Sequence, residues 1–222
     1  MVEEQMLPAR LDSRSIQRAY RKIAPLYDLW GRATESHAQD VCLEWLEQMP
    51  VRHVLDVATG TGTLLEKLLT AFPEATAVGV DLTAAMLGKA ADRLVKFETR
   101  CALVRGDARC LPMPSASSDL VTNCYMFDLL PESEFSAVLG EFSRVLAPGG
   151  RLALINMTLP ERPVERIWEQ LYRLYPALLG GCRGVSLERY LVAGGFRVLR
   201  RARVSQLAFP SEVILAAKEP RR

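Results

Sequence analysis

The chain has 222 residues, 49% of them hydrophobic, and a formal net charge of +2 at pH 7. This length and composition predict one domain with a well-buried α/β core, and the near-balanced charge argues against a nucleic-acid partner or a strongly acidic one. No apolar segment approaches a signal peptide or a membrane span, and the five cysteines lack a Cys-x-x-Cys pair, so we expect a cytoplasmic protein with free thiols.

Apolar spacing predicts helices over about residues 13–26 and 34–48, which we expect to form an N-terminal helical cap. Beyond the cap, short apolar segments alternate with helical ones, which predicts a parallel sheet with helices on both faces. Because a short segment around Phe209-Pro210 joins the last two strands, we expect them to pair antiparallel. The expected strands begin at Val51, Ala75, Cys101, Asp119, Arg151, Arg197 and Val213.

The strongest functional signal is the segment 54–62, which reads Val-Leu-Asp-Val-Ala-Thr-Gly-Thr-Gly. Its apolar residues around Asp56 predict a buried strand, and Gly60 and Gly62 let the backbone turn tightly beside a ligand. A second buried strand ends at Asp81, where a carboxylate can accept hydrogen bonds from a ribose diol. The segment therefore predicts a βαβ unit that binds a nucleotide-like group.

The same segment argues against a phosphate-bearing cofactor. Leu65 stands where dinucleotide-binding loops carry a third small residue, and no phosphate-binding lysine follows the glycines. Asp56 would repel a pyrophosphate but suits a ligand that carries an ammonium group. S-adenosylmethionine has adenine, a ribose diol, an amino acid end and no phosphate, so we predict this cofactor.

Four further segments accompany the glycine loop in order, namely Tyr20–Asp28, Val80–Met86, Gly106–Asp119 and Glu141–Arg151. With them, from about residue 20 to about residue 157, the chain resembles the class I S-adenosylmethionine-dependent methyltransferases. The resemblance is to the branch of ubiquinone and menaquinone C-methyltransferases, also called methyltransferase type 11. It implies a Rossmann-like, doubly wound, seven-stranded and mostly parallel sheet with an antiparallel last strand.

The resemblance also implies an enzyme that methylates a small hydrophobic acceptor, with no metal. A phospholipid N-methyltransferase and a cofactor-binding protein of this fold without turnover remain as alternatives, and the sequence does not choose among C, N, O and S acceptors. We divide the single domain into a cap (1–48), a cofactor-binding core (49–157) and a part with an acceptor-side helix and the final strands (158–222). A nucleic-acid substrate is disfavoured, because Asn123-Cys124-Tyr125-Met126 lacks the prolines of the corresponding Asn-Pro-Pro-Tyr motif.

The predicted cofactor contacts combine the glycine loop with residues carried over from similar enzymes. There, residues like Leu82 and Met86 pack on the adenine and one like Asp107 accepts from its amine, although Leu82 and Met86 are equally compatible with a core role. We expect Thr83 to cap the helix that begins at Ala84, leaving Asp81 free for the ribose. The full predicted set is Tyr27, Asp56, Ala58, Gly60, Thr61, Gly62, Asp81, Leu82, Met86, Gly106, Asp107, Ala108 and Asn123.

Two members of this set have strong structural alternatives. Asn123 is expected at the tip of the fourth strand, where it either contacts the methionine end of the cofactor or caps the strand. Tyr27 resembles a tyrosine that folds over the cofactor, but its place in an apolar helical stripe is also typical of a core residue.

No residue is predicted as catalytic, because methyl transfer from a sulfonium depends mainly on orientation and on exclusion of water. His53 begins the first strand, opposite the ligand edge, and is expected to be structural. His37 lies in the cap and is either a base or a surface residue. Tyr125 is expected either to line the acceptor pocket or to pack in the core.

Acceptor specificity is expected in residues 158–222. The spacing over Val164–Leu178 predicts an apolar helix, and our leading interpretation is that it packs on the sheet; a lid or a membrane-surface contact is the alternative. We expect Arg183 to be a solvated loop residue or to hold an acidic acceptor group, and Cys182 lacks a partner base. Two clusters of basic residues, around the N-terminal helix and near residues 197–203, suggest contact with anionic lipid or phosphate, or solvated surfaces.

Overall fold

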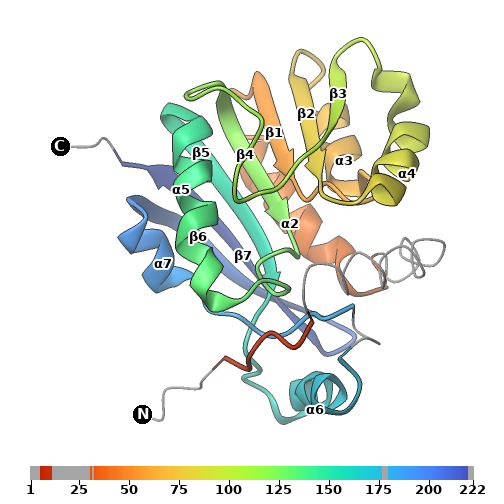
Figure 1. Cartoon of the computed structure of the whole chain (residues 1–222), viewed down its shortest axis with the longest axis vertical. Coiled ribbons are helices and arrows are strands. Elements are labelled where there is room, and N and C mark those ends of the chain that lie inside the picture. Colours follow the sequence, from red (N-terminus) through yellow and green to blue (C-terminus); the bar gives the residue numbers. More distant parts are fainter. Residues whose placement is uncertain (1–5, 12–30, 32, 177–179, 220–222) are drawn as a thin grey trace.

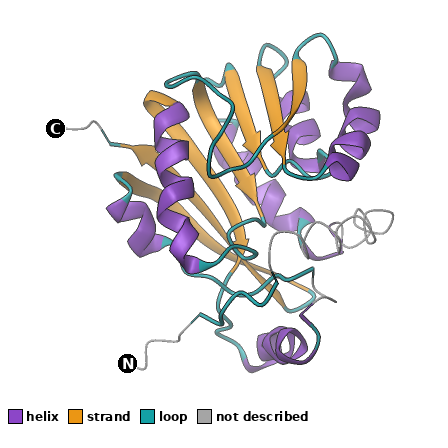
Figure 2. Cartoon of the chain, viewed as in Figure 1, coloured by secondary structure: helices purple, strands orange, loops and turns teal. Residues whose placement is uncertain are grey.

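The computed structural model describes residues 6–11, 31, 33–176 and 180–219 (Figure 1). A seven-stranded sheet in the order β3-β2-β1-β4-β5-β7-β6 carries helices on both faces (Figure 2). The strands are β1 His53–Val57, β2 Thr76–Asp81, β3 Cys101–Arg105, β4 Ser118–Cys124, β5 Leu146–Met157, β6 Phe196–Gln206 and β7 Phe209–Lys218. The helices are α2 Ser36–Leu46, α3 Thr63–Ala71, α4 Ala84–Leu94, α5 Phe135–Val145, α6 Arg166–Leu174 and α7 Glu188–Ala193, with short 3-10 turns η1 Val95–Phe97, η2 Glu132–Glu134 and η3 Pro163–Glu165.

The topology confirms the predicted sheet. Neighbouring strands from β3 to β5 pair parallel, and β7 runs antiparallel to both β5 and β6. After β3 the chain returns to the other side of β1, so the strand order reverses between β1 and β4. Ligands of doubly wound sheets bind at the carboxyl ends of the strands at such a reversal.

Two apolar cores follow from the alternation of side chains along the strands. In β1, Val54 packs with buried residues of α2 and α3, whereas Leu55 and Val57 pack with those of α5 and α7. The central strands are therefore covered on both faces, as their almost continuous apolar sequences require. This burial holds the carboxyl ends of β1, β2 and β4 in fixed positions.

The last two strands form a hairpin with a shorter turn than we predicted. Gln206 pairs with Phe209, so Leu207 and Ala208 alone make the turn, with φ of 50° and 59°. Two successive positive φ angles are typical of a type I′ turn, although neither residue is glycine or asparagine. The predicted turn at Phe209-Pro210 is therefore wrong, because both residues already belong to β7.

The helix predicted over 164–178 is α6, preceded by η3, and it ends at Leu174. Tyr172 is buried and the Trp168 ring packs edge-on against Phe209 of β7 at 5.4 Å between centroids. Ile167 and Leu174, in contrast, are 63% and 70% exposed. The expectation that the apolar residues pack on the sheet is thus wrong for one side of the helix.

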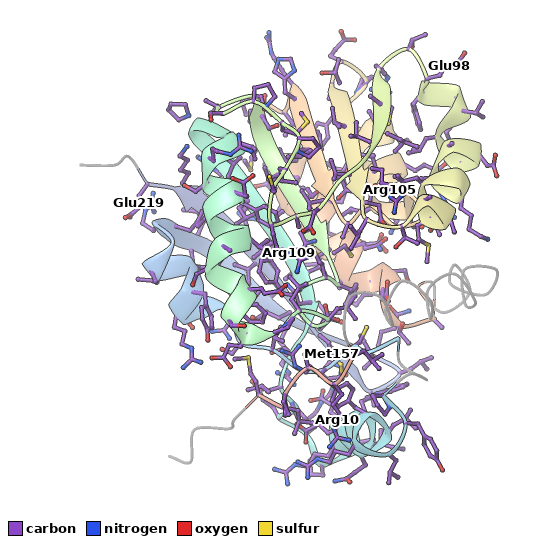
Figure 3. The ribbon with its side chains drawn as sticks, viewed as in Figure 1. Arg10, Glu98, Arg105, Arg109, Met157 and Glu219 are labelled. Carbon is purple, nitrogen blue, oxygen red and sulfur yellow. The ribbon has the colours of Figure 1, made fainter. Side chains whose placement is uncertain are left out.

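The described N-terminal residues 6–11 cross the molecule beside α6, where Figure 3 labels Arg10. The Arg10 amide donates to the Tyr172 hydroxyl, which donates in turn to the Pro8 carbonyl. The Arg10 guanidinium donates to the Arg173 carbonyl at 2.7 Å. This segment therefore ties α6 to the rest of the chain; the predicted helix over 13–26 and Tyr27 lie outside the described residues.

Candidate functional site

The loop between β1 and α3 has the backbone geometry that the two glycines predicted. Gly60 and Gly62 have φ of 56° and 80°, and a Cβ on Gly62 would lie 3.3 Å from that of Ala90 in α4. Ala58 also has a positive φ, of 58°, which is uncommon for a residue with a side chain. Because the Thr59 amide donates to the Val80 carbonyl, the loop is held against the end of β2.

Asp81 holds this loop from the end of β2. Its Oδ2 accepts from the Gly60 amide at 2.9 Å and its Oδ1 from the Thr83 amide at 2.7 Å. The Thr83 side chain makes no capping bond to α4, so the predicted cap is wrong; Asp81 is not left free either, because it accepts from the amide of the residue just before the helix. Burial raises the pKa of Asp81, and the two amide hydrogen bonds oppose that rise.

Asp56 lies beneath the loop and accepts hydrogen bonds from two hydroxyl groups. Thr59 donates to its Oδ2 and Thr122 of β4 to its Oδ1, both at 2.6 Å. Burial raises the pKa of Asp56 to about 6, and the hydrogen bonds from Thr122 and Thr59, which favour the charged carboxylate, oppose that rise. Asp56 therefore ties the glycine loop to β4.

Two adjacent cavities open at this edge of the sheet. The first extends from the ends of β2 and β3 to the loop after β4, and the second lies between the glycine loop and α2. They share Ala58, Gly60 and Cys124 in their walls. Ten predicted residues line one or both cavities, namely Asp56, Ala58, Gly60, Thr61, Asp81, Leu82, Met86, Gly106, Asp107 and Ala108.

The remaining predicted residues behave differently. Asn123 is fully buried, its Nδ2 donates to the Val57 carbonyl at 2.7 Å, and its Oδ1 has no hydrogen-bond partner among the described residues. It bridges β4 to β1 and lines neither cavity, which fits its structural alternative. Gly62 serves the loop and its packing on α4 rather than the cavity wall.

Asp107 is held by a residue that the sequence reasoning missed. Its Oδ1 accepts from the Arg109 amide and Nε, both at 2.9 Å, and its Oδ2 accepts from Nη2 at 2.6 Å. Arg109, labelled in Figure 3, also pairs with Glu134 at 3.0 Å and lines the first cavity. These hydrogen bonds from Arg109 lower the pKa of Asp107, so a carboxylate faces this cavity.

Glu35 and Gln39 were also missed, and both line the second cavity. They are only 4% and 5% exposed, and the Gln39 Oε1 has no hydrogen-bond partner among the described residues. A signal existed: both share the helical stripe of Ala38, Cys42 and Leu46, which is otherwise apolar. A buried polar atom requires a partner, and a ligand can supply one to the Gln39 Oε1.

The Cys124 thiol and the Tyr125 phenol, near the junction of the cavities, stay protonated at neutral pH. Burial raises the pKa values of both Cys124 and Tyr125 well above their usual range. The Tyr125 hydroxyl shares a 2.6 Å hydrogen bond with Ser211. His37 is exposed and lines neither cavity, and His53 lies at the start of β1 with its Nδ1 3.0 Å from the Thr76 hydroxyl.

Arg183 contradicts both of our expectations for it. It is 2% exposed, and its guanidinium donates to the carbonyls of Leu7, Asp128 and Leu130 at 2.6 to 2.9 Å. Burial lowers its pKa. Because backbone carbonyls take these donors, Arg183 neither extends into solvent nor reaches an acceptor, and it joins residues 6–11 to the loop after β4.

Two arginines of β6, Arg201 and Arg203, are engaged by acids of the same chain. Arg201 pairs with Glu212 and Glu188, and Arg203 pairs with Glu165 and Glu161. These ion pairs favour a structural role over the phosphate contact considered from the sequence. No group of acidic, histidine or cysteine side chains in the described part of the chain fits a metal ion.

The donor and acceptor groups fit S-adenosylmethionine. The first cavity offers apolar walls from Leu82 and Met86 with carboxylates at Asp81 and Asp107, which suits adenosine. The second offers carboxylates and the orphaned Gln39 oxygen, which suits an ammonium group. No lysine or arginine lies within the glycine loop itself; Lys67 and Arg93 line the second cavity, where they pair with Asp40 and Glu66.

Comparisons with known proteins agree with this geometry. Residues 54–150 match a methyltransferase domain family. Demethylmenaquinone methyltransferase of Thermus thermophilus is 33% identical over 89% of this chain and 87% of its own length, and a 2-phytyl-1,4-naphtoquinone methyltransferase of Synechococcus elongatus is 29% identical over 71% and 70%. A SAM-dependent methyltransferase structure from Thermotoga maritima superposes with a TM-score of 0.71 at 17% identity, over 92% of this chain and 100% of that one. The chain therefore belongs to the class I S-adenosylmethionine-dependent methyltransferases, in the branch of the ubiquinone and menaquinone C-methyltransferases.

Proposed function

We propose that this enzyme methylates a hydrophobic quinol-type acceptor, with S-adenosylmethionine spanning the two cavities. The main support for the cofactor position is that the two cavities meet at Ala58, Gly60 and Cys124. The first has apolar walls from Leu82 and Met86, whereas the second has the polar side chains of Glu35 and Gln39. The adenosine would lie in the first cavity and the amino acid end in the second. The sulfonium would then lie at the shared residues.

Four polar residues of the two cavities have roles in this arrangement. Asp81 would accept from the ribose hydroxyls and Asp107 from the adenine amine, while Gln39 and Glu35 would accept from the ammonium group. The bound cofactor supplies a methyl group already activated by the positive sulfonium. The remaining task of the chain is to orient the acceptor and exclude water.

The acceptor class is supported by apolar residues of the loop after β4 and by the relatives. Tyr125, Met126, Leu129 and Leu130 line the first cavity beyond the adenosine groups. The relatives are named for demethylmenaquinone and for 2-phytyl-1,4-naphthoquinone, both aromatic nuclei with long apolar tails. Residues 158–222 would contribute to this acceptor side.

We also propose a cytoplasmic location, which accords with five cysteines that form no disulfide.

Two measurements test the proposal. Titration calorimetry should detect S-adenosylmethionine and its demethylated product but not NADH; NADH binding alone would refute the cofactor assignment. Transfer of labelled methyl groups should then be measured with reduced demethylmenaquinone and with phosphatidylethanolamine, each dispersed in detergent. Label in the quinone supports the proposal, whereas label only in the phospholipid would establish the phospholipid N-methyltransferase instead.

A further inference from the structure

Large apolar side chains are exposed at one end of the molecule, on α6 and on the β6–β7 turn. The described residues include eight large hydrophobic side chains that are exposed by about a third or more, and five of them lie here. This clustering distinguishes them from scattered surface residues, which need no explanation. We name these five the α6 surface: Val164, Ile167, Leu174, Tyr175 and Leu207.

The two parts of the α6 surface lie beside each other. Phe209, two residues after Leu207, packs its ring on Trp168 of α6. On the helix, Trp168 and Tyr172 face the rest of the protein, so Ile167 and Leu174 are directed outward. Figure 1 shows α6 next to the end of the β6–β7 hairpin, at the lower edge of the molecule.

The α6 surface adjoins both cavities. Gln206, next to Leu207, accepts from the His37 amide and bonds to Ser36, which lines the second cavity. From α6, Trp168 packs on Phe209, and the Phe209 ring lies 5.9 Å from that of Tyr125, which lines the first cavity. A partner bound to this surface would therefore lie beside the site.

Positive charge borders the apolar residues. On α6, Arg166 and Arg173 are exposed and Glu169 is the one acid, and the Arg10 guanidinium is held at the Arg173 carbonyl. The acids at the start of the segment, Glu161 and Glu165, are both paired with Arg203. An apolar helix face with basic residues beside it is typical of helices that lie in the interface of an anionic bilayer.

We propose that the α6 surface docks the enzyme on an anionic lipid bilayer, with the two cavities beside the membrane. Ile167, Leu174 and Leu207 would enter the interface while the arginines contact lipid phosphates. The purpose of docking rests on the proposed function, because a quinol with a long apolar tail resides in a bilayer. No helix among the described residues is long and apolar enough to cross a membrane, so contact would be from one side.

The test is co-sedimentation of the full chain with vesicles of phosphatidylcholine alone or mixed in equal parts with phosphatidylglycerol. The wild type should bind the mixed vesicles better, and Ile167→Asp with Leu174→Asp should weaken that binding by at least about tenfold. Val192→Asp is the matched control, because Val192 is 66% exposed on α7. It should bind vesicles as the wild type does.

Several outcomes would overturn the docking proposal. The docking proposal fails if the wild type binds neither kind of vesicle. It also fails if the wild type, the double variant and Val192→Asp all bind the mixed vesicles equally. A dimer in light scattering that Ile167→Asp dissociates would identify a second copy as the occupant. Weaker cofactor binding by the double variant in calorimetry would place α6 in the cofactor site instead of on a membrane. A wild type that binds vesicles but does not transfer methyl groups would contradict the proposed function and leave the docking proposal standing.

Discussion

Replacing Asp81 with alanine should weaken S-adenosylmethionine binding by at least about tenfold. A carboxylate offers about four acceptor positions, and the amides of Gly60 and Thr83 take two of them. The Thr83 hydroxyl also bonds to the carboxylate, and the remaining capacity can accept from the ribose, a hydrogen bond to a charged acceptor contributing about 1.5 to 3 kcal/mol. Because tenfold corresponds to about 1.4 kcal/mol, the loss should exceed that factor even if water restores part of it.

The substitution should also lower stability, since both amides lose their acceptor at a site that is 8% exposed. Calorimetry measures the affinity, and thermal unfolding separates it from loss of the fold. Asp107→Ala is the control: Asp107 is more exposed, so it should cost affinity with a smaller loss of stability. A folded Asp81→Ala variant with unchanged affinity would remove Asp81 from the site and with it the adenosine position.

Three further predictions address other parts of the structure. Gln39→Leu should weaken binding of S-adenosylmethionine by about tenfold but leave 5′-methylthioadenosine, which lacks the amino acid end, unaffected in calorimetry; equal losses would exclude an ammonium contact. Arg183→Met should lower the free energy of unfolding by at least about 2 kcal/mol, because it leaves buried carbonyls without donors, and a smaller change in denaturant titrations would contradict this. Burial raises the folded-state pKa values of Asp56 and Asp128 to about 6 and about 7, so the folded state binds their protons more tightly than the unfolded state. The free energy of unfolding should therefore increase by roughly 2 to 3 kcal/mol as the pH falls from about 8 to about 5.5. A decrease over that window would refute the raised pKa values of Asp56 and Asp128.

The sheet could be predicted because its signals are local. Each core strand is a short apolar run, and the glycine loop and Asp81 lie within one βαβ unit. The hairpin turn could not be placed, because Leu207 and Ala208 adopt positive φ without a residue type that favours it. Local preference was overridden there by the pairing of β6 with β7.

The residues that sequence reasoning misplaced depend on contacts between distant parts of the chain. Arg183 is buried because carbonyls from residues 7, 128 and 130 converge on it, and no spacing along the sequence indicates this. The exposed side of α6 has the same origin, since apolar spacing predicts a helix but not how much of its circumference another element covers. Glu35 and Gln39 were predictable in principle, as polar residues within a buried stripe.

Arg109 raises the question of whether the adenine amine and this arginine compete for Asp107. The Arg109 amide, Nε and Nη2 occupy three acceptor positions of the carboxylate. Since a carboxylate offers about four, one remains for the amine, and Arg109 need not leave. Arg109 and Glu134 instead hold the Asp107 carboxylate in one orientation at the cavity wall, just as two amides hold Asp81 at the ribose position. Both carboxylates proposed to bind adenosine are thus already oriented before a ligand arrives, which lowers the entropic cost of binding.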